Sequence, residues 1–405
     1  MKITKLSLIA ALAISAAFAG GDIEKPEVII VPTPEVATTV DGLAKLYFMS
    51  VTPETGTATS GSAGGVTLNV SHKLFDGVTA NFSAVGTMNF APTTTADNIT
   101  LEDTTATLLK NTDGATAGAF FNVANLTMTY GGTTVIAGRQ LINSPMVGGY
   151  DWIMAPGAFE AYTVVNSSIS NLTLVGTYLT KWRPNRKGDM WIDLTSDQLQ
   201  STDGNSANWA GGAIYNAGDY GMLSAWYYNV DAHDYTQIYV DYGVKAYGMG
   251  VKAQYIATTY GTGATRDIAN TDASSSYGVE VSAEVAGWTL AAAYNALTDG
   301  NTEYIGRDGL YTTSWNTQAG YQSNGAADTT TTYKVTASGD LFGLNTSVSY
   351  GGYGDGNEID AILNYSYNKS VGAMLVYTNV TPNAIGDGNS GTQYSTLEIA
   401  VNYKF

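Results

Sequence analysis

The chain has 405 residues, and only 13% of them are charged, against about 25% in a typical soluble domain. A mean hydropathy of −0.04 excludes a bundle of long apolar helices, and a formal charge of −17 argues against nucleic-acid binding as the main task. The lack of Cys excludes disulfides, thiolate metal sites and cysteine nucleophiles, while two His leave little material for an imidazole-based centre.

The N-terminal segment predicts export. Two lysines precede an apolar stretch over residues 6–16, and Ala17-Phe18-Ala19 supplies the small residues of a cleavage site. Because this stretch is shorter than the about 20 residues that span a bilayer, we predict a cleaved signal peptide over residues 1–19. Residues 20–42 carry three prolines and five acidic residues, which predicts an extended periplasmic tether.

The rest of the chain, residues 43–405, alternates with a period of two. Between Gly77 and Phe90, for example, apolar side chains occupy one parity and Thr, Asn and Ser occupy the other. Such alternation predicts strands with one apolar and one polar face. We predict eighteen strands, at residues 43–51, 64–75, 77–90, 118–130, 133–142, 158–167, 171–182, 207–216, 221–230, 236–243, 246–258, 275–286, 288–297, 331–339, 343–351, 358–367, 371–380 and 394–405.

The connections between these strands are alternately short and mostly long, and the longest covers residues 298–330. All six prolines after the tether fall in the predicted long loops, as strands that must satisfy every N–H within lipid require. This rhythm, with strands of about ten residues, is typical of an outer-membrane barrel. We therefore predict an all-β, transmembrane antiparallel β-barrel over residues 43–405, with eighteen strands and sixteen as the alternative.

The last predicted strand alternates up to the carboxyl end of the chain, where Tyr403 and Phe405 are its final apolar-parity residues. This ending resembles the C-terminal signal by which outer-membrane barrel precursors are recognised for assembly. We therefore expect Tyr403 and Phe405 to act as an assembly signal, with the barrel-assembly machinery as a partner and the bacterial outer membrane as the location.

A family resemblance lies in the third long loop. The sequence Gly-Arg-Gln-Leu-Ile-Asn-Ser-Pro at residues 138–145 is followed by Asp-Trp-Ile-Met-Ala-Pro at 151–156 and Phe-Glu-Ala-Tyr at 159–162. It resembles the OprD-type porins and the related major outer membrane proteins of epsilonproteobacteria, although Ile153 stands where that family usually has Arg. The resemblance implies an eighteen-stranded channel, often trimeric, with the third loop folded into the lumen.

The same resemblance suggests a pore constriction. If loop 143–157 folds inward, we expect Asp151 to approach the lumen wall near Arg139, with Glu160 in the same zone. Lys252 and Lys334 lie on polar parities and would add a basic counterweight. Opposed charges across a narrow pore would orient dipolar solutes. The alternative is that Arg139 and Asp151 only pair with each other and pin the loop.

The predicted extracellular loops hold 20 Asp or Glu and 6 Lys or Arg. Such a field raises the cation concentration at a pore mouth within a Debye length of about 8 Å, so we predict a cation preference. Alternatively, the acidic loops only keep the surface soluble or bind divalent cations alongside lipopolysaccharide.

These features predict a porin for passive diffusion of ions and small hydrophilic solutes, without enzymatic activity or a cofactor. A structural or adhesive barrel that acts through its loops is the alternative, but sixteen to eighteen strands leave an aqueous channel. We expect outer-membrane lipid and lipopolysaccharide as partners, and a homotrimer is compatible with the resemblance.

Overall fold

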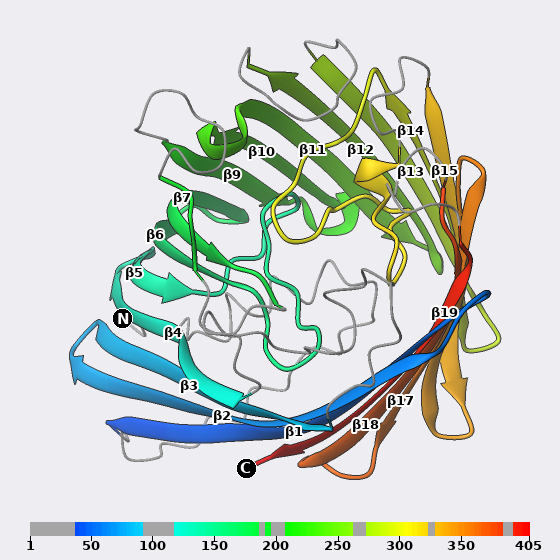
Figure 1. Cartoon of the computed structure of the whole chain (residues 1–405). Helices are drawn as coiled ribbons and strands as arrows, with labels where there is room; N and C mark the ends of the chain where they lie inside the picture. The colour runs from blue at the N-terminus through cyan, green and yellow to red at the C-terminus, as the bar shows by residue number, and fades with distance from the viewer. Residues whose placement is uncertain are drawn as a thin grey trace.

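The computed structural model describes residues 37–91, 117–185, 191–195, 207–261, 273–322, 329–383 and 392–405. Antiparallel strands form one ring (Figure 1). They are β1 (Thr38–Pro53), β2 (Thr59–Phe75), β3 (Val78–Ala91), β4 (Ala117–Tyr130), β5 (Thr133–Gln140), β6 (Ala158–Asn166), β7 (Leu172–Arg183), β8 (Ile192–Asp193), β9 (Asn208–Asn216), β10 (Met222–Val230), β11 (Tyr235–Ala246), β12 (Met249–Tyr260), β13 (Ala273–Val285), β14 (Trp288–Thr298), β15 (Thr330–Leu341), β16 (Leu344–Tyr353), β17 (Gly356–Ser366), β18 (Val371–Thr381) and β19 (Tyr394–Lys404).

The wall of the ring consists of eighteen strands, because β8 has two residues and pairs only with the end of β7. Strand β7 pairs directly with β9, and β1 pairs with β19, so the barrel closes. The prediction of eighteen strands is confirmed. Strand β1 begins at Thr38, so residues 38–42 of the predicted tether belong to the wall. The predicted signal peptide and most of the tether lie outside the described residues.

Within the described residues, three short 3₁₀ helices accompany the strands, at Gly218–Tyr220, Asp231–His233 and Ala319–Tyr321. Among the described residues, no helix is long and apolar enough to cross a membrane.

The barrel closes where the chain ends. The N–H of Gly42 donates to the carbonyl of Phe405 at 2.9 Å, and the N–H of Phe405 donates to the carbonyl of Gly42 at 3.0 Å. The ring of Phe405 lies over Gly42 so closely that a Cβ at this glycine would overlap it. Tyr403, half exposed, stacks on Phe405 with ring centroids 6.0 Å apart. Whatever their role in assembly, both residues belong to the closing seam.

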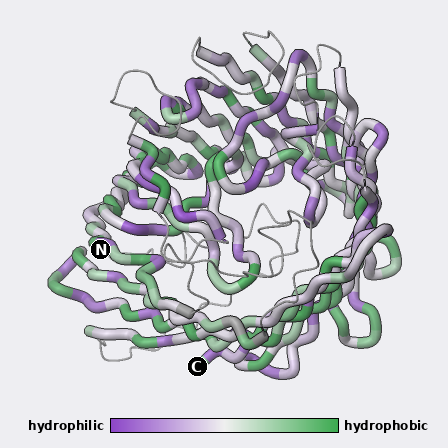
Figure 2. The backbone as a smooth tube through the Cα atoms, in the orientation of Figure 1, coloured by the Kyte–Doolittle hydropathy of each residue, from purple (hydrophilic) through white to green (hydrophobic). Residues whose placement is uncertain are grey.

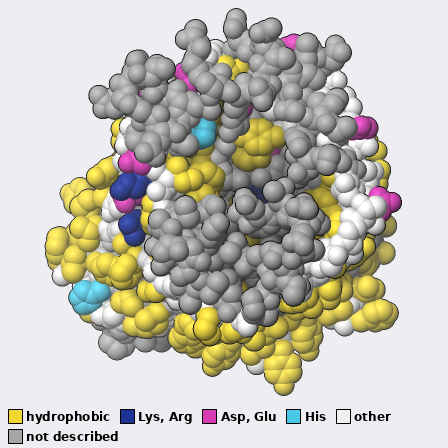
Figure 3. Space-filling model, in the orientation of Figure 1, with side chains coloured by type: hydrophobic (Ala, Val, Ile, Leu, Met, Phe, Trp, Pro, Cys, Tyr) yellow, Lys and Arg dark blue, Asp and Glu magenta, His cyan; other side chains and the backbone are white. Residues whose placement is uncertain are grey.

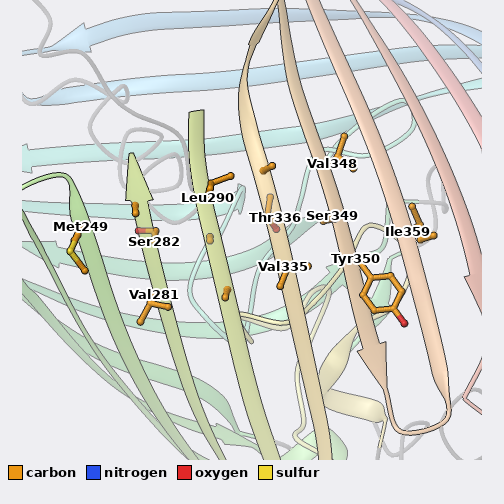
Figure 4. A pocket seen from close by; sticks show the side chains of 14 residues that line it. Met249, Val281, Ser282, Leu290, Val335, Thr336, Val348, Ser349, Tyr350 and Ile359 are labelled. Carbon is orange, nitrogen blue, oxygen red and sulfur yellow. The ribbon is translucent and has the colours of Figure 1, made fainter. Parts of the chain in front are cut away.

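The two faces of the wall differ as the alternation predicts. Outward side chains such as Val281, Leu290 and Val335 are about half exposed. Hydrophobic and hydrophilic residues alternate along the strands (Figure 2), and hydrophobic side chains gather on the outside of the wall (Figure 3). These three side chains also line a shallow apolar groove of about 640 Å³ across β12–β17 (Figure 4). Apolar positions therefore face lipid, and the closed ring leaves no open edge among the described strands of the wall.

The packed core lies inside the barrel, where two long loops meet the inner wall (Figure 1). We name them the β5–β6 loop, residues 141–157, and the β14–β15 loop, residues 299–329, of which 299–322 and 329 are described. The inward position of the β5–β6 loop agrees with the family resemblance. The inward position of the β14–β15 loop was not predicted from the sequence.

Candidate functional site

The β5–β6 loop crosses the interior of the barrel. Near its start, Met146 is fully buried, and its N–H donates to the hydroxyl of Tyr228 on β10 at 3.3 Å. Near its end, Ile153 and Met154 pack in one cluster with Tyr47 of β1 and with residues of β2 and β19. The loop is therefore fixed on two walls of the barrel and occupies part of the lumen between them.

The β14–β15 loop lies beside it. The N–H of Gly148 donates to the carbonyl of Ile305 at 3.0 Å, and the N–H of Ile305 donates to the carbonyl of Met146 at 2.9 Å. Farther along, the guanidinium of Arg307 lies 5.4 Å from the ring centre of Tyr150. The two loops thus form a short parallel bridge and then continue in contact.

Side chains of the inner wall hold the β14–β15 loop through its backbone. Glu358 of β17 is fully buried and accepts the N–H groups of Asn316 at 2.8 Å and Thr317 at 2.7 Å. Lys334 of β15 donates to the carbonyl of Thr313 at 2.7 Å. The ammonium predicted as a basic counterweight in the pore is therefore engaged in fixing this loop.

Both loops also meet at one carboxylate, that of Glu398 on β19, which is fully buried. The indole N–H of Trp152, from the β5–β6 loop, donates to Oε2 at 3.0 Å. The indole N–H of Trp315, from the β14–β15 loop, donates to Oε1 at 2.9 Å. The hydroxyl of Tyr47 on β1 also donates to Oε2. Burying a carboxylate is costly unless donors surround it, and here three donors do so.

A cluster of three charged side chains lies on the neighbouring strands β5, β6 and β7. Glu160 pairs with Arg139, with 3.6 Å between Oε2 and Nε, and with Lys181, with 3.7 Å between Oε1 and Nζ. The guanidinium of Arg139 also lies 4.4 Å from the ring centre of Trp191. All three charged side chains are about one-third exposed. Arg139 and Glu160 lie together in this cluster, to which the structure adds Lys181, and their role in a pore constriction stays a prediction.

Asp151 does not approach Arg139, so that prediction is wrong. Its carboxylate pairs with Lys45 of β1 at 3.2 Å and is 64% exposed. The reason lies in its neighbour Trp152, whose bond to Glu398 places this part of the loop at the seam between β1 and β19.

Lys252 of β12 pairs with Glu280 of β13 at 2.9 Å. Its Nζ lies 5.8 Å from the ring centre of Tyr311 in the β14–β15 loop. The pair is partly exposed, so the predicted lysine lies on the inner wall with its charge balanced by a carboxylate. Among the described residues, no group of three or more His, Asp or Glu could hold a metal ion.

The β14–β15 loop has an internal carboxylate, Asp308, which accepts the N–H of Gly320 at 2.8 Å and that of Leu310 at 3.3 Å. Burial raises the pKa of Asp308 above its usual range, although a hydrogen bond from the hydroxyl of Thr313, the two backbone hydrogen bonds and Arg307 act in the opposite direction. The loop therefore carries a titratable group whose protonation depends on how well the loop is packed.

Comparisons with known proteins agree with this geometry. The family model described as outer membrane porin, OprD family, matches residues 96–374. The structure is similar to that of OccAB4 from Acinetobacter baumannii, with 15% identity, a TM-score of 0.71 and coverage of 93% of this chain and 100% of that chain. It is also similar to OpdK from Pseudomonas aeruginosa, solved with vanillate, with 15% identity, a TM-score of 0.71 and coverage of 91% and 98%. No curated protein sequence matches the chain.

Proposed function

Because the chain belongs to the OprD family of outer-membrane porins, we propose that the channel it forms for small solutes prefers cations. The observation that carries the proposal is the charge of the predicted extracellular loops, which hold 20 acidic against 6 basic residues, and 15 acidic against 5 basic residues when the two inward loops are left out. A field of this sign concentrates cations and depletes anions at the mouth of the pore.

The partly exposed charged groups of the inner wall oppose this preference only weakly. The pairs Lys45–Asp151 and Lys252–Glu280 are formally neutral, and the cluster of Arg139, Glu160 and Lys181 carries one net positive charge. Because the two inward loops narrow the lumen, a passing ion comes within a Debye length of these groups. The larger acidic excess at the mouth therefore decides the sign of the selectivity.

A second candidate is the passage of small carboxylates. Arg139 and Lys181 share one carboxylate partner, so together they offer donors for an anionic group. OpdK, which has the same fold, was solved with vanillate, itself a carboxylate.

The experiment that tests the proposal is the reversal potential of the purified protein in a planar bilayer under a KCl gradient. A potential of the sign set by K⁺ supports cation preference, and a potential of zero or of the Cl⁻ sign contradicts it. Added vanillate reduces the current if carboxylates bind at the Arg139 cluster. The double variant Arg139→Gln with Lys181→Gln is the matched control, since its current should no longer respond.

We also propose that residues 1–19 are removed on export. The charge and apolar pattern of this segment and the outer-membrane location of the family support this. Mass spectrometry of the mature protein tests it: the expected N-terminus is Gly20, and retention of the segment would contradict it.

A further inference from the structure

We propose that Glu398 is a positioning residue that holds both inward loops in one arrangement and thereby sets the conductance of the channel. The inference deepens the proposed function and rests on one part of it, namely that the barrel conducts ions. One carboxylate on the last strand thus positions both of the loops that narrow the pore.

The first argument is the set of donors around this carboxylate. Three segments distant in sequence converge on it: β1 through Tyr47, the β5–β6 loop through Trp152 and the β14–β15 loop through Trp315. An indole N–H is a donor only, so neither tryptophan can exchange this bond for one in which it accepts. Hydrogen bonds to an ionised acceptor are about twice as strong as neutral ones, which makes this the strong attachment of each indole.

The second argument is the contact between the two loops themselves. They are bridged at Val147 and Ile305 and touch again at Tyr150 and Arg307. Their second common attachment is Glu398, which both tryptophans reach from their own loop. Two loops joined at two places behave as one unit across the lumen, which we call the strap. Releasing the attachment at Glu398 therefore moves both loops rather than one.

The third argument is the position of Glu398 in the wall. It lies opposite Met49 across the seam between β1 and β19, and its bond from Tyr47 crosses that seam. The attachment point of the strap is therefore complete only in the closed barrel. The neighbouring acid Glu358 differs in this respect, because the loop groups that it accepts, at Asn316 and Thr317, belong to the β14–β15 loop alone.

This difference between the two acids supplies the test. We would record single-channel conductance in planar bilayers for the variants Trp152→Phe, Trp315→Phe, Glu398→Gln and Glu358→Gln. Each Phe variant keeps an aromatic ring and removes one indole N–H. Loss of a hydrogen bond to a charged group lowers the ratio of docked to released loop by about ten- to a hundredfold. Both Phe variants should therefore show a larger mean conductance and an additional open level.

Coupling distinguishes a shared anchor from two independent ones. Adding Trp152→Phe to Glu398→Gln should change the conductance less than adding it to the wild type. Adding the same substitution to Glu358→Gln should give the full effect. The outward-facing Trp288 offers a control, because Trp288→Phe leaves the lumen unchanged. Heat-modifiable migration on gels verifies that each variant folds, and if Glu398→Gln does not, the two Phe variants in the intact wall decide.

The proposal is overturned if the folded Trp152→Phe and Trp315→Phe variants conduct like the wild type. It is equally overturned if Trp152→Phe couples to Glu358→Gln as strongly as to Glu398→Gln. A wild-type protein that conducts while its variants do not differ refutes only the role of Glu398. A folded wild-type protein that does not conduct refutes the channel itself.

Discussion

Replacing Arg139 by Ala tests whether the charged cluster on β5–β7 acts on passing ions. The side chain contacts Glu160, the ring of Trp191 and the carbonyl of Phe121, and none of these belongs to the β5–β6 loop. The substitution therefore removes a lumen charge and leaves the attachments of that loop intact. We expect an increase in the permeability of cations relative to anions.

The magnitude follows from Coulomb's law. The guanidinium is about one-third exposed, so the dielectric response of water applies to it. For an ion about 7 Å away, the interaction is about 0.6 kcal/mol in water, and screening at about 0.15 M salt reduces it to about 0.25 kcal/mol. Because a cation and an anion are affected with opposite sign, the permeability ratio changes by about 0.5 kcal/mol, or about twofold.

The assay is the reversal potential in a salt gradient, repeated at low and high salt, where the effect should grow and shrink respectively. Glu160→Gln removes the opposite charge from the same cluster and should shift the ratio by a similar factor toward anions. Lys369→Ala, on the exposed turn between β17 and β18, is the control for loss of a positive charge elsewhere. Unchanged reversal potentials together with a lower unfolding temperature would show that Arg139 only stabilises the wall and would refute the reasoning.

Three further outcomes are expected. Val335→Arg places a charge on the lipid face and should destabilise the barrel by up to about 2–4 kcal/mol, measured by urea unfolding from vesicles. The control is Thr336→Lys at the next residue, which faces the lumen and should lose little stability. Equal losses of stability would show that the two faces are misassigned. Gly42→Val should displace the ring of Phe405 and lower the temperature of the heat-modifiable gel shift, and a wild-type temperature would speak against a tight seam. Because burial raises the pKa of Asp308, its carboxyl group binds a proton more tightly in the packed β14–β15 loop than in the released loop. Docking of the loop therefore strengthens as the pH falls through the raised pKa, and the open-channel noise should decrease. A pH response that persists in Asp308→Asn would exclude this group.

The strands could be predicted from the sequence because each one records its two environments locally. A strand such as β13 alternates Val279 and Val281 with Glu280 and Ser282, and lipid on one side and water on the other require that order at every step. Among the strands that the structure describes, only β8 was not predicted, because two residues show no period.

The arrangement of the inward loops could not be predicted in the same way. The bond from Trp152 to Glu398 joins residues 246 positions apart, and the pair Lys45–Asp151 joins residues 106 positions apart. Such partners are set by closure of the barrel, and loop sequences carry no period that reports it. The usable signal was two tryptophans, Trp152 and Trp315, in the predicted long loops, together with acids on the inner parity of β17 and β19.

The central claim is that the barrel, with its two inward loops in place, encloses an open aqueous pore. The most direct test is single-channel recording of the purified, heat-modifiable wild-type protein in a planar bilayer. We predict uniform stepwise increases in conductance, each corresponding to the insertion of an open channel. Folded protein that inserts into the bilayer and gives no conductance steps would contradict the claim. It would favour a barrel with a blocked lumen that acts through its extracellular loops.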